Sequence, residues 1–218
     1  MEEAMKARLV WITPEADAQV AYCARVSNPA NQDNKDIAKL LRYCAKNEHW
    51  SVFEMASACV EITTTRDIAR QILRHRSFSF QELSQRYTSV HVLPEAQLRE
   101  CRLQDEKNRQ NSLPNESEAL ADWWLHAQAH VASSANTLYK EALKHGIAKE
   151  QARALLPEGL TTSRLYMAGT LRSWITYLRV RIAASTQKEH RDVAHDALTV
   201  LSAECPVIFS AFFGHDAT

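Results

Sequence analysis

Runs of alternating and of helically spaced apolar residues divide the 218-residue chain into expected strands and helices. Segments rich in β-forming residues predict three strands, at 8–13, 56–63 and 160–167. Elsewhere apolar residues recur at intervals of three and four, which predicts amphipathic helices. These helices are expected at about 15–28, 36–47, 65–73, 116–146, 170–182 and 189–203. A shorter helix is expected over 149–157, where Pro157 would end it, and the segment 206–213 is apolar.

Few strands and several long helices predict an α+β fold, with a small mixed or antiparallel sheet flanked by long helices. The chain is long enough for one sizeable core, and no repeat or low-complexity tract marks a boundary. One domain over 1–218 is therefore expected.

Four segments between these elements carry weaker patterns. Residues 77–81 alternate Ser and Phe, which predicts an extended segment. An extended conformation over 84–86 would place Ser84 and Arg86 on one side. Residues 90–94 are compatible with a short strand, and the highly charged segment 99–115 is expected to be a surface loop.

Composition removes several classes of protein. The 26 basic residues are balanced by 26 acidic ones, which argues against a general nucleic-acid or membrane-surface binder. No apolar run is long enough for a membrane helix and no signal peptide is visible, so a cytoplasmic location is expected. Five scattered cysteines form no C-x-x-C pair, and Cys59 is expected to be a buried apolar residue. His126 and His130 are four residues apart, but no third ligand is evident, so no metal is expected.

The densest group of polar side chains lies between residues 74 and 87. Arg74, Arg76 and Arg86 fall within thirteen residues, together with His75 and Glu82. Arginine is rarely buried without a partner, and its guanidinium binds phosphate in a bidentate fork. This segment therefore predicts a site for a phosphorylated small molecule.

The same residues carry a family resemblance. The sequence Arg74-His75-Arg76 followed after seven residues by Ser84 resembles the signature of flavin-dependent thymidylate synthases. Matches elsewhere extend the resemblance over most of the chain: His49-x-Ser51-x-x-Glu54, Glu150-x-x-Arg153 before Leu156-Pro157, and Arg181 with Gln187.

The resemblance implies a reaction and an assembly. dUMP would be methylated at C5 to dTMP, with 5,10-methylenetetrahydrofolate as carbon donor and NADPH supplying hydride through FAD. No cysteine nucleophile would take part. The fold would be of the ThyX type, in a homotetramer whose active sites draw on several subunits. Since the four glycines form no G-x-G-x-x-G loop, side chains and helix ends would have to hold the FAD pyrophosphate.

The resemblance also assigns residues. Catalytic roles would fall to Arg181, Ser84 and His49. Flavin-binding residues would be Ser51, Glu54, Arg74, His75, Arg76, Arg172 and Thr176. The nucleotide would be bound by Gln71, Arg74, Glu82, Leu83, Ser84, Gln85, Arg86, Arg153, Arg181 and Gln187.

Two of these assignments are qualified by the chemistry of the side chains. Ser84 has no evident base beside it in the sequence, which favours phosphate binding over a nucleophilic role. Thr176 stands where the family carries Asn or His, and a hydroxyl cannot offer the paired donor and acceptor of an amide. An inactive flavin-binding relative is therefore one alternative. A platform for single-stranded nucleic acid, built from arginines with Phe78, Phe80 and Tyr87, is another, but the charge balance counts against it.

Overall fold

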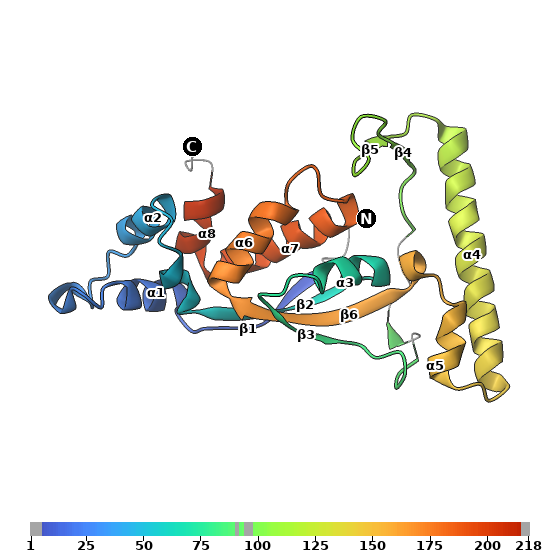
Figure 1. Cartoon of the computed structure of the whole chain (residues 1–218), viewed down its shortest axis with the longest axis horizontal. Coiled ribbons are helices and arrows are strands. Elements are labelled where there is room, and N and C mark those ends of the chain that lie inside the picture. The colour runs from blue at the N-terminus through green and yellow to red at the C-terminus, as the bar shows by residue number, and fades with distance from the viewer. Residues whose placement is uncertain (1–5, 90–91, 94–97, 215–218) are drawn as a thin grey trace.

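The computed structural model describes residues 6–89, 92–93 and 98–214. At its centre lies a four-stranded antiparallel sheet with the strand order β1-β2-β6-β3 (Figure 1). The strands are β1 (Ala7–Ile12), β2 (Ser57–Thr65), β6 (Thr162–Thr170) and β3 (Ser79–Glu82). The expected α+β class is confirmed, and the sheet is antiparallel throughout rather than mixed.

The two longest strands form the axis of the sheet. β2 and β6 pair along nine residues, from Ser57 opposite Thr170 to Thr65 opposite Thr162. Successive side chains of a strand point to opposite faces, so every second residue can enter the core. Val60, Ile62 and Leu165 are fully buried on the face that helices cover.

Three helices cover that face: α3 (Arg66–Ile72), α6 (Leu171–Arg181) and α7 (Lys188–Glu204) (Figure 1). α3 and α6 each begin at the residue that follows a strand, and because β2 and β6 are antiparallel, the two helices start at opposite ends of this strand pair. The hydroxyl of Thr170 accepts a hydrogen bond from the Ser173 amide at 3.3 Å and caps α6. The end of α3 then lies beside the end of α6, through His75 and Arg181, and beside the start of α7, through Gln71 and Gln187.

A helical group closes one end of the molecule. It consists of α1 (Ala16–Ala24), α2 (Ala38–Lys46), two 3₁₀ turns (Pro29–Asn31 and Trp50–Glu54) and α8 (Pro206–Phe213). The apolar segment 206–213 is thus a helix. The Asp17 carboxylate accepts the amides of Val207 and Ile208 at 2.9 and 3.0 Å and so caps it. Burial nevertheless raises the pKa of Asp17.

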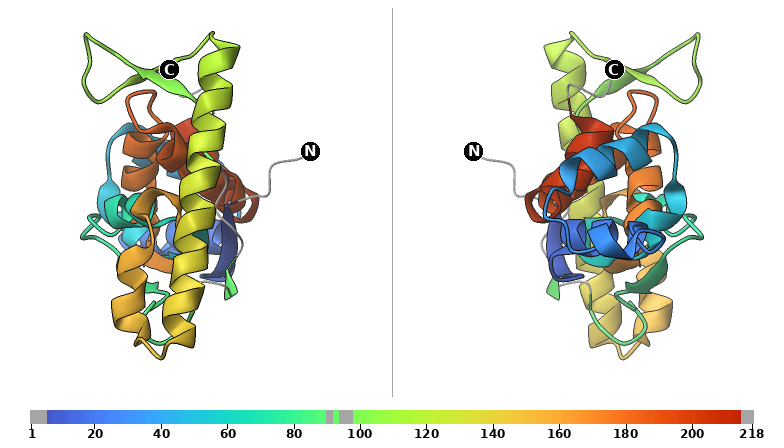
Figure 2. Two further views of the ribbon diagram at one scale, coloured as in Figure 1. Left: turned by 90° about the vertical axis from the view of Figure 1, so that its right-hand side faces the viewer. Right: turned by 90° about the vertical axis from the view of Figure 1, so that its left-hand side faces the viewer.

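The opposite end is built on the 27-residue helix α4 (Glu118–Lys144), which stands at the side of the sheet (Figures 1 and 2). It confirms the helix expected at 116–146. The short α5 (Lys149–Ala152) follows, and then two 3₁₀ turns at Arg153–Leu155 and Glu158–Leu160. The helix expected at 149–157 is therefore correct in position but shorter than expected, because its last turn tightens.

Some expectations for the connecting segments were wrong. The expected loop at 99–115 contains a two-stranded hairpin, β4 (Arg102–Gln104) and β5 (Ser112–Pro114). Residues 85–87 form a turn rather than an extended segment, since the Ser84 carbonyl accepts the amides of Tyr87 and Thr88. Of the expected strand at 90–94, residues 90, 91 and 94 lie outside the described residues, and 92–93 are not in a strand.

Candidate active site

The ends of α3 and α6 bring together residues that are far apart in the sequence. Arg181, in the last turn of α6, donates a hydrogen bond from Nε to Nε2 of His75 at 3.0 Å, across 106 residues of chain. An arginine can only donate, so Nε2 of His75 carries no proton and the neutral ring carries it on Nδ1. His75 also packs edge-on against Tyr177, with the ring centroids 4.9 Å apart.

Polar side chains continue from this pair into the interior. The Tyr177 hydroxyl lies 3.1 Å from Nε2 of His190, and Nδ1 of His190 lies 3.2 Å from Oε1 of Gln71. Gln71 donates to Oε1 of Gln187 at 2.8 Å, and Gln187 donates to Glu189 at 2.8 Å. These residues, with Arg181 and His75, are the first group of site residues, and they join the end of α3, the inner face of α6 and the start of α7.

Burial decides the charges in this cluster. Burial, together with the smaller effect of the positive charge of Arg181, lowers the pKa of His75 to about 4 and that of His190 to about 3. Burial also raises the pKa of Tyr177 above its usual value. Both histidines are consequently neutral at pH 7, and Arg181 is the cation of the cluster.

Arg74 and Arg76 flank His75 but point elsewhere. Both side chains are exposed, and neither has an ion pair or hydrogen bond within the described part of the chain. Gln71 and His75 thus share one cluster as expected from the helix end, whereas Arg74 does not join them. Two unpaired guanidinium groups of this kind suit an anionic ligand with two phosphates.

The segment that follows is anchored by an aromatic ring. Phe78 packs edge-on against Trp174 with centroids 5.0 Å apart, and it lies over Gly169 so closely that a Cβ there would meet its ring at 2.6 Å. Phe80 packs against the same core. Two rings of the platform considered for nucleic acid are thus partly buried against the core, whereas the third, Tyr87, is 76% exposed.

A second group of the expected nucleotide-binding residues lies around the start of α5. The Arg86 guanidinium pairs with Glu150 at 3.3 Å, and Nε of Arg153 donates to the Glu150 carbonyl at 3.2 Å. The Ser84 hydroxyl accepts the Arg86 amide at 3.4 Å. The Gln85 side chain is buried, and its Nε2 has no partner among the described residues. Leu83 joins the sheet edge through its amide, which donates to the Arg164 carbonyl.

Glu82 lies between this group and the sheet. Its carboxylate accepts the Ser163 hydroxyl at 2.6 Å and lies 3.7 Å from Arg66. Its charge is thus already partly matched within the chain.

A third group lies at the start of α6. Arg172 pairs with Glu54, so two residues expected to meet the flavin meet each other in this chain. Thr176 donates its hydroxyl to the Arg172 carbonyl at 2.9 Å, which leaves its oxygen as an acceptor. Ser51 is exposed nearby in the 3₁₀ turn, and His49 is exposed with its ring edge-on to Tyr43 at 5.6 Å.

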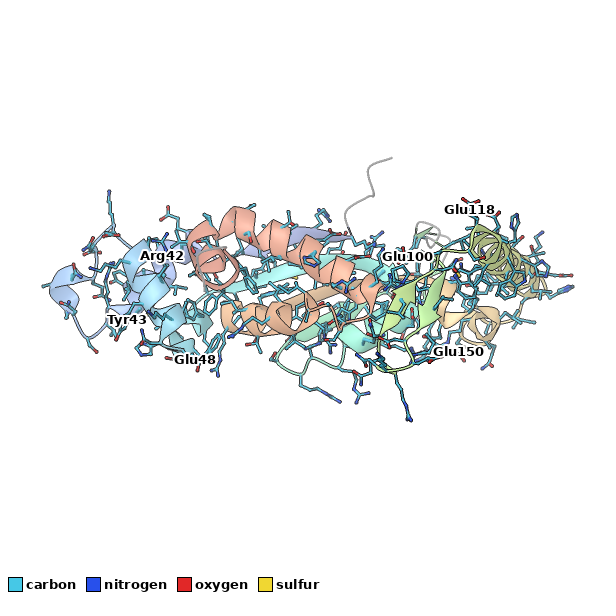
Figure 3. The ribbon with its side chains drawn as sticks, turned by 90° about the horizontal axis from the view of Figure 1, so that it is seen from above. Arg42, Tyr43, Glu48, Glu100, Glu118 and Glu150 are labelled. Atoms are coloured by element: carbon cyan, nitrogen blue, oxygen red, sulfur yellow. The ribbon has the colours of Figure 1, made fainter. Side chains whose placement is uncertain are left out.

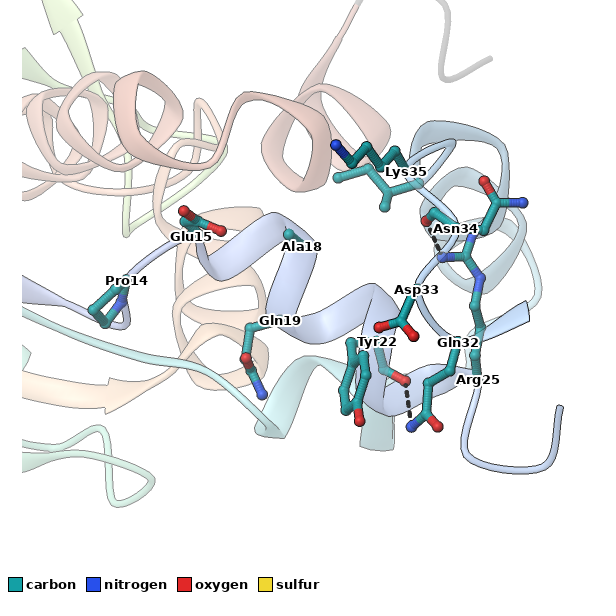
Figure 4. Close-up of a pocket in the computed structure, with 11 residues that line it drawn as sticks. Pro14, Glu15, Ala18, Gln19, Tyr22, Arg25, Gln32, Asp33, Asn34 and Lys35 are labelled. Carbon is teal, nitrogen blue, oxygen red and sulfur yellow. Dashed lines mark hydrogen bonds between the residues drawn. The ribbon is translucent and has the colours of Figure 1, made fainter. Parts of the chain in front are cut away.

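The three groups do not form one site within the chain. In the view from above, Tyr43 and Glu48, next to His49, lie toward one end, and Glu150 lies at the other (Figure 3). The first and third groups are connected along α6, whose nine-residue step from Arg172 to Arg181 spans about 14 Å. A further pocket of about 570 Å³ lies between α1 and the 32–37 loop, where Tyr22, Arg25 and Asp33 line it (Figure 4). None of the expected site residues lines that pocket.

Comparisons with known proteins identify the family. The family model described as "Thymidylate synthase complementing protein" matches residues 8–207. A flavin-dependent thymidylate synthase of Synechocystis is 52% identical over 88% of this chain and 87% of its own length. A probable flavin-dependent thymidylate synthase of Paramecium bursaria Chlorella virus 1 is 45% identical over 95% of this chain and 98% of its own. The chain belongs to the flavin-dependent thymidylate synthases.

A solved structure of a nucleotide-binding protein is similar over most of the chain. The UMP/dUMP methylase PolB of Streptomyces cacaoi, solved with 5-Br dUMP, superposes with a TM-score of 0.80 at 27% identity. The match covers 94% of this chain and 93% of that protein. None of the helices in the described part combines the length and apolarity needed to cross a membrane.

The described residues fit the flavin that this family uses. The exposed guanidinium groups of Arg74 and Arg76 have no anionic partner among the residues that the structure describes, and the pyrophosphate of FAD would supply two phosphates. His75 keeps a proton on Nδ1 and can donate it to a ligand.

Reasoning from the sequence missed three residues of the first group: Tyr177, His190 and Glu189. The signal was available: His190 occupies the first position of the buried stripe of α7, three and four residues before Val193 and Ala194. A histidine in an apolar stripe has to find polar partners inside the protein, and here it finds Tyr177 and Gln71.

Proposed function

We propose that this chain converts dUMP to dTMP, with 5,10-methylenetetrahydrofolate as carbon donor and with NADPH as the source of hydride through bound FAD. The observation that carries the proposal is the cluster of Arg181, His75, Gln71 and Gln187, in which one cation stands beside neutral donors and acceptors. Bound FAD would supply the hydride transfer, so the protein's own groups need to bind, orient and polarise.

Arg181 is suited to the pyrimidine. The C5 atom of uracil becomes more nucleophilic as the ring takes on enolate-like character, in which negative charge is shared between C5 and the carbonyl oxygens. A preorganised guanidinium stabilises such charge. His75 is neutral and only accepts a hydrogen bond from Arg181, so the positive charge of Arg181 remains available to the pyrimidine. Gln71 and Gln187 have the paired donors and acceptors that a uracil edge requires.

The remaining residues divide between nucleotide and flavin. Arg153, Arg86 and Ser84 would hold the dUMP phosphate, with Glu82, Leu83 and Gln85 lining the approach to it. Arg74 and Arg76 would meet the flavin phosphates, with Arg74 also reaching the nucleotide. Ser51, Glu54, Arg172 and Thr176 would complete the flavin site, with His49 near flavin and folate.

Because these groups lie apart in one chain, we propose that the active site is completed by neighbouring copies in a homotetramer. The long helix α4 supports this. Leu120, Val131 and Leu138 share one face of it and are 38, 47 and 51% exposed. Apolar side chains repeated along the exposed face of a helix are typical of a surface that another subunit covers.

The test measures three signals in turn. The purified protein should show a flavin spectrum, NADPH should bleach it, and tritium should be released from C5-labelled dUMP when folate is present.

Arg181→Ala should reduce tritium release by about 10²- to 10³-fold while bound flavin is retained. Arg179→Ala is the matched control, since Arg179 lies on the same helix and packs over Trp50 instead. Protein that takes up neither FAD nor dUMP would refute the proposal, and bleaching without tritium release would indicate an inactive relative.

A further inference from the structure

A line of four hydrogen bonds runs through the site from Tyr177 to Glu189. Its links are Tyr177 to His190 at 3.1 Å, His190 to Gln71 at 3.2 Å, Gln71 to Gln187 at 2.8 Å, and Gln187 to Glu189 at 2.8 Å. The residues come from α3, α6 and α7, so the line connects the three helices that cover the sheet.

The last member fixes the direction of every link. An ionised carboxylate only accepts, so Gln187 has to present its nitrogen to Glu189 and its oxygen to Gln71. Gln71 then has to donate its nitrogen to Gln187, which leaves Oε1 facing His190. Oxygen can only accept there, so His190 has to carry its proton on Nδ1, and its bare Nε2 accepts the Tyr177 hydroxyl proton.

Burial makes this arrangement costly to change. His190 is 0% exposed and Tyr177 is 1% exposed, so water cannot replace a lost partner. If the Gln71 amide were flipped, its NH₂ group would face the Nδ1 proton of His190, and two buried donors would oppose each other. The direction set at Glu189 is thereby carried through to the two glutamines.

We propose that Tyr177 and His190 are positioning residues that lock the amide groups of Gln71 and Gln187 in one orientation for a pyrimidine nucleotide. This rests on the proposed function, since the nucleotide is dUMP. Neither residue touches substrate. Each glutamine keeps one N–H and one lone pair outside the line, and these are held ready for the alternating donors and acceptors of a uracil edge. A pyrimidine amino group at C4, as in a cytosine nucleotide, reverses that alternation and is disfavoured.

The first experiment reads the proton position without substrate. Solid-state ¹⁵N NMR of the flavin-loaded protein, labelled at its histidine rings, should show neutral histidines protonated at Nδ1, and one of these signals should disappear in His190→Asn while that of His75 remains. A His190 ring protonated at Nε2 would overturn the proposal, because the line would then run in the other direction.

The second experiment measures binding of dUMP by calorimetry, with the dCMP affinity alongside. His190→Leu removes the donor to Gln71 and should raise the dissociation constant of dUMP about tenfold, the value of one hydrogen bond. His190→Asn is the matched variant, because its amide nitrogen stands close to the position of Nδ1; it should stay within about threefold of the wild type. KM for dUMP should follow the dissociation constant while kcat changes little.

The outcomes distinguish a role of His190 in orienting the glutamine amides from a role in packing alone. A residue needed only for packing would lose stability in both variants and leave the affinities equal. Equal dUMP affinity in wild type and His190→Leu would overturn the proposal, and so would Asn behaving like Leu. If His190→Leu does not fold, the NMR result and the Asn variant still decide it. Wild-type protein that binds no dUMP would defeat the proposed function itself, whereas an Nε2 proton with normal dUMP binding would defeat the positioning role alone.

Discussion

His190 shows how one buried side chain connects stability to pH. Its pKa is lowered to about 3, mainly by burial and then by the positive charge of Arg181, while an unfolded histidine titrates near 6.5. Between about pH 6.5 and pH 3, His190 therefore binds a proton in the unfolded chain but not in the folded chain. The free energy of unfolding should fall as pH falls, by up to about 1.4 kcal/mol per pH unit for this residue.

Melting temperatures at pH 7.5 and pH 5 measure the effect. The wild type should melt lower at pH 5, and His190→Asn should reduce this difference because it removes the titrating ring. His195→Asn is the control, since His195 lies on the same helix but is exposed. An undiminished difference in His190→Asn would show that other groups cause the acid sensitivity.

Arg76 carries a prediction about the flavin. Its side chain is exposed and has no anionic partner within the described residues, so its loss should leave the fold intact. Arg76→Ala should purify with less bound flavin, judged by the ratio of visible to ultraviolet absorbance at equal protein concentration. Arg42→Ala, an exposed arginine on α2, should keep the wild-type ratio. Flavin content equal to that of the wild type would refute the role of Arg76.

At the scale of elements, Gly169 of β6 leaves room for Phe78, and the packing of Phe78 there fixes the position of the Arg74–Arg76 segment. Phe78 lies over Gly169 and between Trp174 and Tyr177, and its amide donates to the His75 carbonyl at 3.3 Å. Gly169→Ala would push the ring away, because the added Cβ would come within 2.6 Å of it. The cost should be about 1–3 kcal/mol of stability, with weaker flavin retention as the turn shifts.

Thermal melts and flavin content test this together. Gly159→Ala is the control, because the atoms nearest its added Cβ lie 3.8 Å away at the Arg99 guanidinium. If Gly169→Ala matches Gly159→Ala in both measurements, the close approach of Phe78 has no role in positioning the segment.

The elements also show what the sequence could and could not predict. The core helices and strands were predictable because each buries one face, and burial leaves a period of 2 or 3.6 residues. The β4–β5 hairpin was missed because its three-residue strands bury little and depend on polar bonds instead, such as Arg102 Nε to Ser112 at 2.7 Å. Such bonds leave no periodic pattern.

The site was predictable only in part. The resemblance supplied Gln71, His75, Arg181 and Gln187, and the structure brings these four together. The pairing of Glu54 with Arg172 could not be foreseen, because charge partners across 118 residues depend on tertiary geometry. His190 could have been found from its position in the α7 stripe, but its link to Gln71 could not.

At the scale of the whole molecule, the distance between the groups of site residues leads to a decisive test of shared active sites. Arg153 lies beside α5 at one end, while Arg181 lies with His75 in the middle. If neighbouring copies complete each site, Arg153 and Arg181 of one site come from different chains. Two inactive variants, Arg153→Ala and Arg181→Ala, should then restore activity when they are assembled together.

The expected recovery follows from random mixing. With equal amounts of both chains, a site receives an intact Arg153 half of the time and an intact Arg181 half of the time, so about a quarter of the sites should be complete. Co-expression with two different affinity tags isolates the mixed assemblies for the tritium-release assay. The control mixes Arg181→Ala with His75→Ala: those side chains touch within one chain, at 3.0 Å, so every site keeps one lesion and activity stays at the mean of the two parents. Recovery in neither mixture would place Arg153 and Arg181 of each site on the same chain, and the separation of the groups would then have to be closed by movement within the chain.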